Sequence, residues 1–213
     1  MSFALKAGKK KVITRKDIIK FSIKPSTANT CMGYAKECNL LSCESQIVSA
    51  KNKQKNNIEY QFTGQLTTFV ASEWFFRDQG KTYSGTRDEQ NKQKYKGDMG
   101  IDLPPYPIDV KGGRIRYHSK DILTYNLFVR PHERHESNIY IATLADFTDE
   151  FEKCKVYLMG WIHEKDLPSE LNYKYDKDSS KKGTFALQNK MLNPLPKFND
   201  TFENKLETFG LQK

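Results

Sequence analysis

Residues 101–103 and 108–111 alternate between apolar and charged side chains, and a Pro-Pro dipeptide at 104–105 separates the two segments. Successive side chains of a β-strand point to opposite faces. The pattern therefore predicts a hairpin of two short strands with one apolar and one charged face. The charged face would bring together two carboxylates and an ammonium, those of Asp102, Asp109 and Lys111.

The residues around this hairpin predict a mixed α and β domain. An amphipathic helix is expected over 65–78, stopped by Gly80, and strand-like runs follow at 123–129, 139–144 and 156–162. The segment FENKLETF near the C-terminus predicts a helix at the domain edge. This order of elements is typical of a sheet with helices packed beside it.

The N-terminal quarter shows a different pattern. Thr14 and Asp17 begin a predicted helix that breaks at 23–25, and Ser26 caps a second helix with one apolar face. Alternating residues at 46–49 and 58–62 then predict two strands joined by a basic loop. We expect a domain boundary at Gly64, which gives domains over 1–64 and 65–213.

The positive charge of the chain is concentrated in that same quarter. The 213 residues carry a formal net charge of +9, and residues 1–55 hold 12 Lys/Arg against 3 Asp/Glu, which accounts for all of it. Such an imbalance favours binding to a polyanion. A disordered basic arm or an ordinary solvated surface has the same charge, so the count alone leaves those alternatives open.

Two helices, a turn and a basic hairpin resemble the winged helix-turn-helix family over about residues 12–63. The resemblance implies that the helix from Ser26 enters the major groove of DNA, with Asn29 as the candidate for adenine recognition. Lysines of the wing would contact phosphates. The DNA-binding candidates are Arg15, Lys16, Ser26, Thr27, Asn29, Thr30, Lys51, Lys53 and Lys55.

The charged face of the predicted hairpin has a chemical use. Two neighbouring carboxylates repel each other unless a cation lies between them, and Mg²⁺ prefers such oxygen ligands. A nearby lysine can offset negative charge that develops on a phosphoryl group. The pattern therefore indicates hydrolysis of a phosphodiester.

An Asp at the end of one strand followed by Asp-x-Lys on the next resembles the PD-(D/E)xK nuclease superfamily, the restriction-endonuclease-like fold. The resemblance implies that Asp102, Asp109 and the carbonyl of Val110 bind metal and that Lys111 is the catalytic lysine. Ile101 replaces the usual proline, and Asp98 is a possible substitute for Asp102. Glu73, on the preceding helix, either supports the metal site or lies in solvent.

Several patterns have simpler interpretations. A second acid-x-Lys triplet, Glu203-Asn204-Lys205, lies in a predicted helix, and the less favoured alternative for the hairpin charges is a solvated surface ion pair. The cysteines lack metal-site spacing, so we interpret them as small core residues. His132 and His135 are interpreted as part of a solvated loop rather than a metal site.

The sequence thus predicts an α+β protein in which a winged helix precedes a restriction-endonuclease-like α/β core with a mixed central sheet. We expect a Mg²⁺-dependent, site-specific DNA endonuclease, with Mn²⁺ as a plausible substitute. Double-stranded DNA is the expected substrate, and cutting both strands suggests a possible homodimer. The alternatives are a structure-selective nuclease and a non-catalytic DNA-binding protein. The chain has no apolar run of about 18 residues and no export signal, so we expect no membrane contact and a cytoplasmic protein.

Overall fold

The computed structural model describes residues 12–45, 58–81, 101–116, 120–136, 138–148, 150–151, 153–172 and 183–211, apart from the side chains of 38–45. The helices are α1 Pro25–Ser45, α2 Ile58–Phe75 and α4 Phe202–Phe209. The strands are β1 Ile19–Ser22, β2 Ile108–Arg114, β3 Asn126–Val129, β4 Ile139–Asp146, β5 Lys155–His163 and β6 Phe185–Gln188. Short 3₁₀ turns are η1 Arg15–Asp17, η2 Ile122–Thr124, η3 Pro131–Glu133, η4 Glu164–Asp166 and η5 Asn189–Met191.

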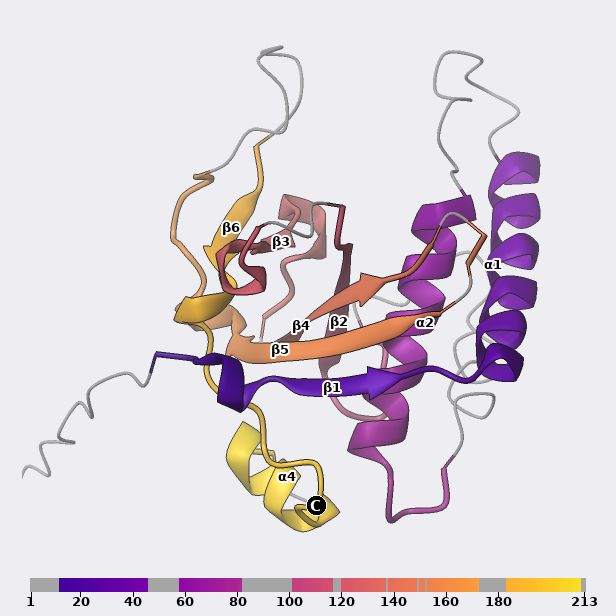
Figure 1. The fold of residues 1–213 in the computed structure, drawn as a ribbon. Coiled ribbons are helices and arrows are strands. Elements are labelled where there is room, and N and C mark those ends of the chain that lie inside the picture. Colours follow the sequence, from indigo (N-terminus) through magenta and orange to yellow (C-terminus); the bar gives the residue numbers. More distant parts are fainter. Residues whose placement is uncertain are drawn as a thin grey trace, which may run out of the picture.

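Four strands form a mixed sheet in the order β1-β5-β4-β2 (Figure 1). β2 runs parallel to β4, whereas the β4–β5 and β5–β1 pairs are antiparallel. β4 is an almost continuous apolar run, IYIATLA, in which Thr143 is the polar residue, as is typical of a strand buried on both faces. β3 and β6 form a separate antiparallel pair.

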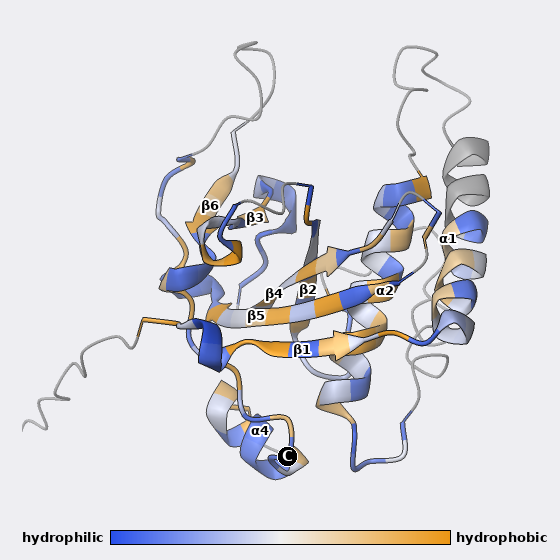
Figure 2. Ribbon diagram, viewed as in Figure 1, coloured by the Kyte–Doolittle hydropathy of each residue, from blue (hydrophilic) through white to orange (hydrophobic). Residues whose placement is uncertain are grey.

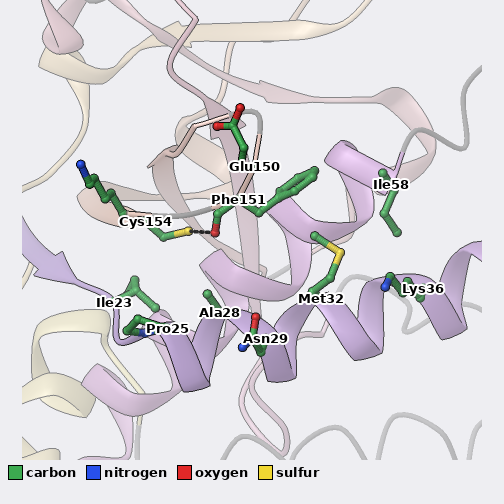
Figure 3. A pocket seen from close by; sticks show the side chains of 11 residues that line it. Ile23, Pro25, Ala28, Asn29, Met32, Lys36, Ile58, Glu150, Phe151 and Cys154 are labelled. Atoms are coloured by element: carbon green, nitrogen blue, oxygen red, sulfur yellow. Dashed lines mark hydrogen bonds between the residues drawn. The ribbon is translucent and has the colours of Figure 1, made fainter.

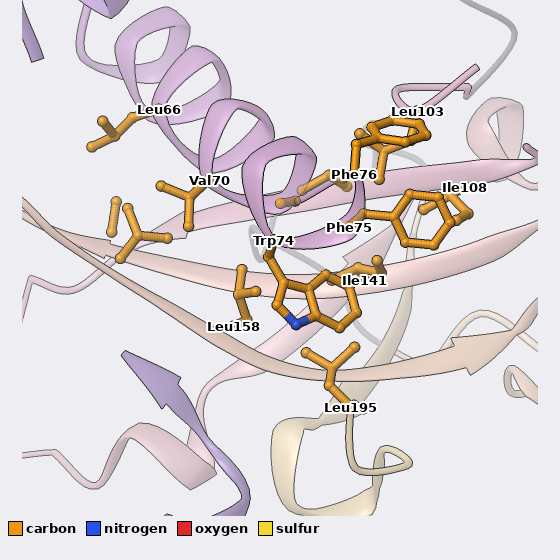
Figure 4. Close-up of a cluster of buried hydrophobic side chains, with 14 of the residues drawn as sticks. Leu66, Val70, Trp74, Phe75, Phe76, Leu103, Ile108, Ile141, Leu158 and Leu195 are labelled. Atoms are coloured by element: carbon orange, nitrogen blue, oxygen red, sulfur yellow. The ribbon is translucent and has the colours of Figure 1, made fainter. Parts of the chain in front are cut away.

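Alternation along β4 divides the core between the two faces of the sheet. Ile139 and Ile141 pack with α2 on one face, whereas Tyr140 and Ala142 pack on the other face with residues of β3 and β6. In Figure 4, side chains of α2 point toward the strands. The labelled residues from α2 include Leu66, Val70, Trp74 and Phe75.

Helix α2 lies very close to β2. A Cβ placed on Gly112 would come within 2.5 Å of the Thr67 hydroxyl, so a larger residue there would force helix and strand apart. This contact helps to fix the position of β2, the strand that carries the predicted catalytic residues.

Figure 2 shows that β1, β4 and β5 are mostly hydrophobic, whereas α4 is a mixture of hydrophobic and polar positions. Thr201 caps α4 by accepting a hydrogen bond from the backbone of Asn204, and Gly210 ends it in the left-handed conformation that glycine favours. Among the described residues, every helix is too short or too polar to span a bilayer.

The structure corrects the prediction for the N-terminal quarter. Residues 19–22 form strand β1 rather than part of a helix, since Ile19 and Phe21 alternate with polar neighbours at the period of a strand. Residues 58–62 begin helix α2 rather than the second strand of a wing, because Phe62, Leu66 and Val70 continue the pattern at helical spacing.

These two changes remove the predicted winged helix from the described residues. β1 joins the same sheet as β2, β4 and β5, and α2 runs through Gly64 without a break, so the chain shows no boundary at that position. The predicted strand over 46–49 and the wing lysines Lys51, Lys53 and Lys55 lie outside the described residues.

The expected α and β class and the mixed sheet are confirmed. The helix predicted from Ser26 corresponds to α1, and the helix over 65–78 to the second part of α2. The predicted strands at 123–129, 139–144 and 156–162 correspond to β3, β4 and β5. Residues 101–103 form a turn rather than a strand, so the predicted hairpin is wrong in its first half.

Candidate active site

Strand β2 presents Asp109 and Lys111 together on one face of the sheet. Their apolar neighbours, Ile108 and Val110, point to the opposite face and pack with α2. The Nζ atom of Lys111 lies 2.8 Å from Oδ2 of Asp109, and the two side chains are only 18% and 3% exposed. The alternation in the sequence therefore produces a largely buried ion pair rather than a solvated surface pair.

Asp102 reaches the same strand through the turn that precedes it. Its backbone N–H donates to the carbonyl of Ile108 at 2.8 Å, and its Oδ2 accepts a hydrogen bond from the N–H of Val110 at 2.7 Å. The negative charge of Asp102 acts on Lys111. The structure thus brings all three predicted residues together, although a turn rather than a hairpin does so.

A third carboxylate, which the sequence did not indicate, also contacts the lysine. Oε1 of Glu133, in η3, lies 3.4 Å from Nζ of Lys111. The loop over 130–136 had the charged composition of a solvated segment, and no spacing within it links Glu133 to β2. Only the path of the chain after β3 places this residue beside the site.

The carboxylates hold Lys111 in its charged form. Burial alone would lower the pKa of this lysine, but Asp109, Glu133 and Asp102 outweigh burial, so the pKa lies above its ordinary value. Tyr140 is the register partner of Asp109 on β4, and burial raises the pKa of its hydroxyl. Both groups therefore keep their protons at neutral pH.

The donor set suits a hard divalent cation. Mg²⁺ is commonly held by one or two carboxylates and completes its coordination with water and substrate phosphates. Asp102 and Asp109 supply such carboxylates, and the Val110 carbonyl directly follows Asp109 in the chain. Among the residues that the structure describes, no group of three or more His, Cys, Asp or Glu side chains is arranged to hold a metal.

Glu73 is not part of this arrangement. It lies on the exposed side of α2, which packs against the face of the sheet opposite to Asp109 and Lys111. Partial burial raises the pKa of its carboxyl. Of the two interpretations of Glu73 from the sequence, the solvent-facing one agrees with this placement. Asp98 lies outside the described residues.

The described DNA-binding candidates lie away from the Asp109–Lys111 pair. Arg15 and Lys16 are exposed in η1, just before β1 at the opposite edge of the sheet. The other described candidates occupy the first turns of α1, namely Ser26, Thr27, Asn29 and Thr30.

Asn29 lines a pocket of about 830 Å³ between α1 and the turn after β4 (Figure 3). Asp109 pairs with Tyr140 near the start of β4, whereas this pocket adjoins residues beyond its end at Asp146. Six residues of strand correspond to about 20 Å. The pocket and the ion pair therefore lie at opposite ends of the sheet.

Two of the four cysteines can be compared with the prediction of core residues. The thiols of Cys31 and Cys154 are buried, and burial raises their pKa values to about 12 and about 11. Both fit the predicted role of small core residues. The side chains of Cys38 and Cys43 lie outside the described set.

Comparison with known proteins found no match: no protein-family model, no curated protein and no solved structure is similar to the chain.

Proposed function

We propose that this protein is a metal-dependent endonuclease that hydrolyses phosphodiester bonds of double-stranded DNA. The observation that carries the proposal is the largely buried 2.8 Å pair of Asp109 and Lys111, with Asp102 held beside it by the N–H of Val110. A lone Asp-x-Lys triplet is a weak signal, but a second carboxylate delivered by a separate segment is a stronger one.

Each residue of the site has a defined role in this proposal. Asp102, Asp109 and the carbonyl of Val110 would hold Mg²⁺ or Mn²⁺, which polarises a phosphoryl oxygen and lowers the pKa of bound water. Lys111 stays protonated because its pKa is raised, so its ammonium offsets negative charge that develops on the phosphoryl group. The bond from Val110 keeps Asp102 oriented toward β2.

The structure offers more support for DNA cleavage in general than for cleavage at a specific sequence. Site-specific, restriction-type cutting relied on a winged helix, and the segment expected to form its second strand begins α2 instead. A structure-selective nuclease is therefore an equally good form of the proposal, and either a homodimer or sequential nicking would cut both strands. In a non-catalytic DNA-binding protein the same ion pair would serve only to stabilise the fold.

The test is incubation of the full chain with supercoiled plasmid in Mg²⁺, Mn²⁺ or EDTA. A closed circle has no ends, so nicked or linear product demonstrates endonuclease activity. We expect cleavage with either metal, none in EDTA, and none by Asp109→Asn, which retains the shape of the side chain but loses its charge. Circular dichroism checks that the variant is folded.

Intact plasmid with both metals would contradict the proposal, provided that linear DNA, methylated DNA and branched junctions also remain intact. Cleavage by Asp109→Asn at the rate of the unmodified chain would contradict the assignment of the site.

A further inference from the structure

One oxygen atom of Glu133 contacts both Lys111 and Arg130, the residue directly before η3. Oε1 of Glu133 lies 3.4 Å from Nζ of Lys111 and 3.5 Å from Nε of Arg130. Because both distances end on the same atom, the two nitrogens are at most 6.9 Å apart. Two cationic groups thus lie side by side at the site and share the carboxylate of Glu133, while Lys111 also pairs with Asp109.

The segment that carries this arginine is fixed to the sheet. Oε2 of Glu133 accepts a hydrogen bond from the N–H of Arg130 at 2.9 Å, which closes the turn of η3. The hydroxyl of Tyr140, a buried residue of β4, donates to the carbonyl of Glu133 at 2.9 Å and accepts from the N–H of His135 at 3.1 Å. The position of Arg130 relative to Lys111 is therefore set by the fold.

The two arginines of this segment differ in how much of their binding capacity is already used. Arg134 pairs with Glu164, donates to the carbonyl of Pro168 at 3.1 Å and stacks on Phe185 at 4.6 Å from the ring centre. Arg130 has a side chain that is 64% exposed, and its ion pair with Glu133 is long. Exposed pairs of this kind contribute little stability, so Arg130 can exchange partners readily.

We propose that Arg130 binds a backbone phosphate of the DNA substrate, at or next to the phosphodiester that Lys111 faces. This inference rests on the proposed nuclease function and adds a contact with the substrate. A planar guanidinium donates two parallel hydrogen bonds to a phosphate, and because Nε of Arg130 lies within 6.9 Å of Nζ of Lys111, one phosphate or two adjacent ones can contact both cations. Glu133 acts as a positioning residue that holds both cations at the same place.

The test measures the affinity of the full chain for a fluorescent DNA duplex by anisotropy, in EDTA and over a series of salt concentrations. We expect Arg130→Ala to weaken binding about tenfold and to lower the slope of log affinity against log salt by about 0.9, the value for one lost phosphate contact. Arg130→Lys retains the charge, so we expect it to preserve the slope and to lose only the bidentate geometry.

Arg116→Ala is the matched control. The side chain of Arg116 is 51% exposed and also pairs with one acidic residue, 2.6 Å to Glu59, but it lies beyond the far end of β2, five residues after Lys111. We expect this variant to bind within twofold of the unmodified chain. Because both variants remove one exposed arginine with one acidic partner, they differ mainly in position.

Three results would overturn the inference: affinity and salt slope unchanged in Arg130→Ala, equal losses in the Arg130 and Arg116 variants, or no binding of the duplex by the unmodified chain. The plasmid assay distinguishes failure of the Arg130 inference from failure of the proposed nuclease function. If the unmodified chain cuts plasmid while Arg130→Ala binds normally, the inference alone fails. If no cutting occurs but Arg130→Ala loses affinity and salt slope, the phosphate contact stands and the nuclease function fails.

Discussion

Two acid-x-Lys triplets in this chain have opposite surroundings. In Asp109-Val110-Lys111 on β2, residues two apart share a face, and the ammonium lies 2.8 Å from the carboxylate. In Glu203-Asn204-Lys205 on α4, residues two apart lie about 200° around the helix, so the carboxylate is exposed while Lys205 is fully buried. The same acid-x-Lys spacing produces an ion pair in the strand and separated charges in the helix.

The buried Lys205 of α4 contacts the backbone and side chain of Trp74 and has no acidic partner within its own triplet. Its Nζ atom donates to the carbonyl of Trp74 at the end of α2 and lies 5.4 Å from the centre of the indole ring. Burial lowers the pKa of Lys205, whereas carboxylates raise that of Lys111. An acid-x-Lys spacing therefore brings the two charges into contact only where the segment is a β-strand.

The largest expected difference between the two lysines is in catalysis. Lys111→Met keeps the aliphatic stem but removes the ammonium, and we expect the rate of plasmid cleavage to fall at least about 100-fold. Lys205→Met makes the same chemical change in the other triplet, and we expect its rate to stay within twofold. Rates of nicking at saturating Mg²⁺ measure both. Equal losses would mean that the triplet on β2 has no special role.

The same two variants, Lys111→Met and Lys205→Met, should also differ in stability, by a smaller effect. Lys111→Met leaves Asp109 buried near other carboxylates without its ammonium, and we expect a loss of about 3 kcal/mol in unfolding free energy. Lys205→Met loses one hydrogen bond but also removes a buried cation, so we expect a change below about 1 kcal/mol. Urea denaturation at pH 7 measures both. A larger loss in the α4 variant would reverse the comparison.

The smallest expected effect is a pH dependence specific to α4. Burial lowers the folded-state pKa of Lys205, although Asp78 and Asp200 oppose this shift and Arg77 adds to it. A folded pKa below the unfolded value of about 10.4 means that protonation opposes folding. The contribution of Lys205 to stability should therefore increase as pH rises from the folded pKa toward about 10.4.

Urea denaturation between pH 8 and 10.5 tests this sign. The unfolding free energy of the unmodified chain, minus that of Lys205→Met, should increase with pH. Arg77→Gln is the accompanying control, since removing its charge should reduce the increase without eliminating burial. A difference that stays flat or falls with pH would show that this lysine is not destabilised by its surroundings.

The secondary-structure predictions that the structure confirms come from segments whose hydrophobic period fits only one type of element. β4 and β5 combine length, strong hydrophobicity and β-branched residues, and α4 has a capping threonine and a terminal glycine. Residues 58–62 failed because a five-residue segment can match a strand and the first turn of a helix equally well. The extension into Leu66 and Val70 decides between them.

The sequence by itself determined that Asp109 and Lys111 share a face, because alternation in a strand is a local property of the backbone. It also determined the apolar runs that become the central strands. The tertiary structure alone decided that the turn before β2 anchors Asp102 on Val110, that Glu133 joins the lysine from a loop after β3, and that β1 belongs to the same sheet. Those contacts join residues distant in the chain, and their energies depend on packing and burial that no local pattern contains.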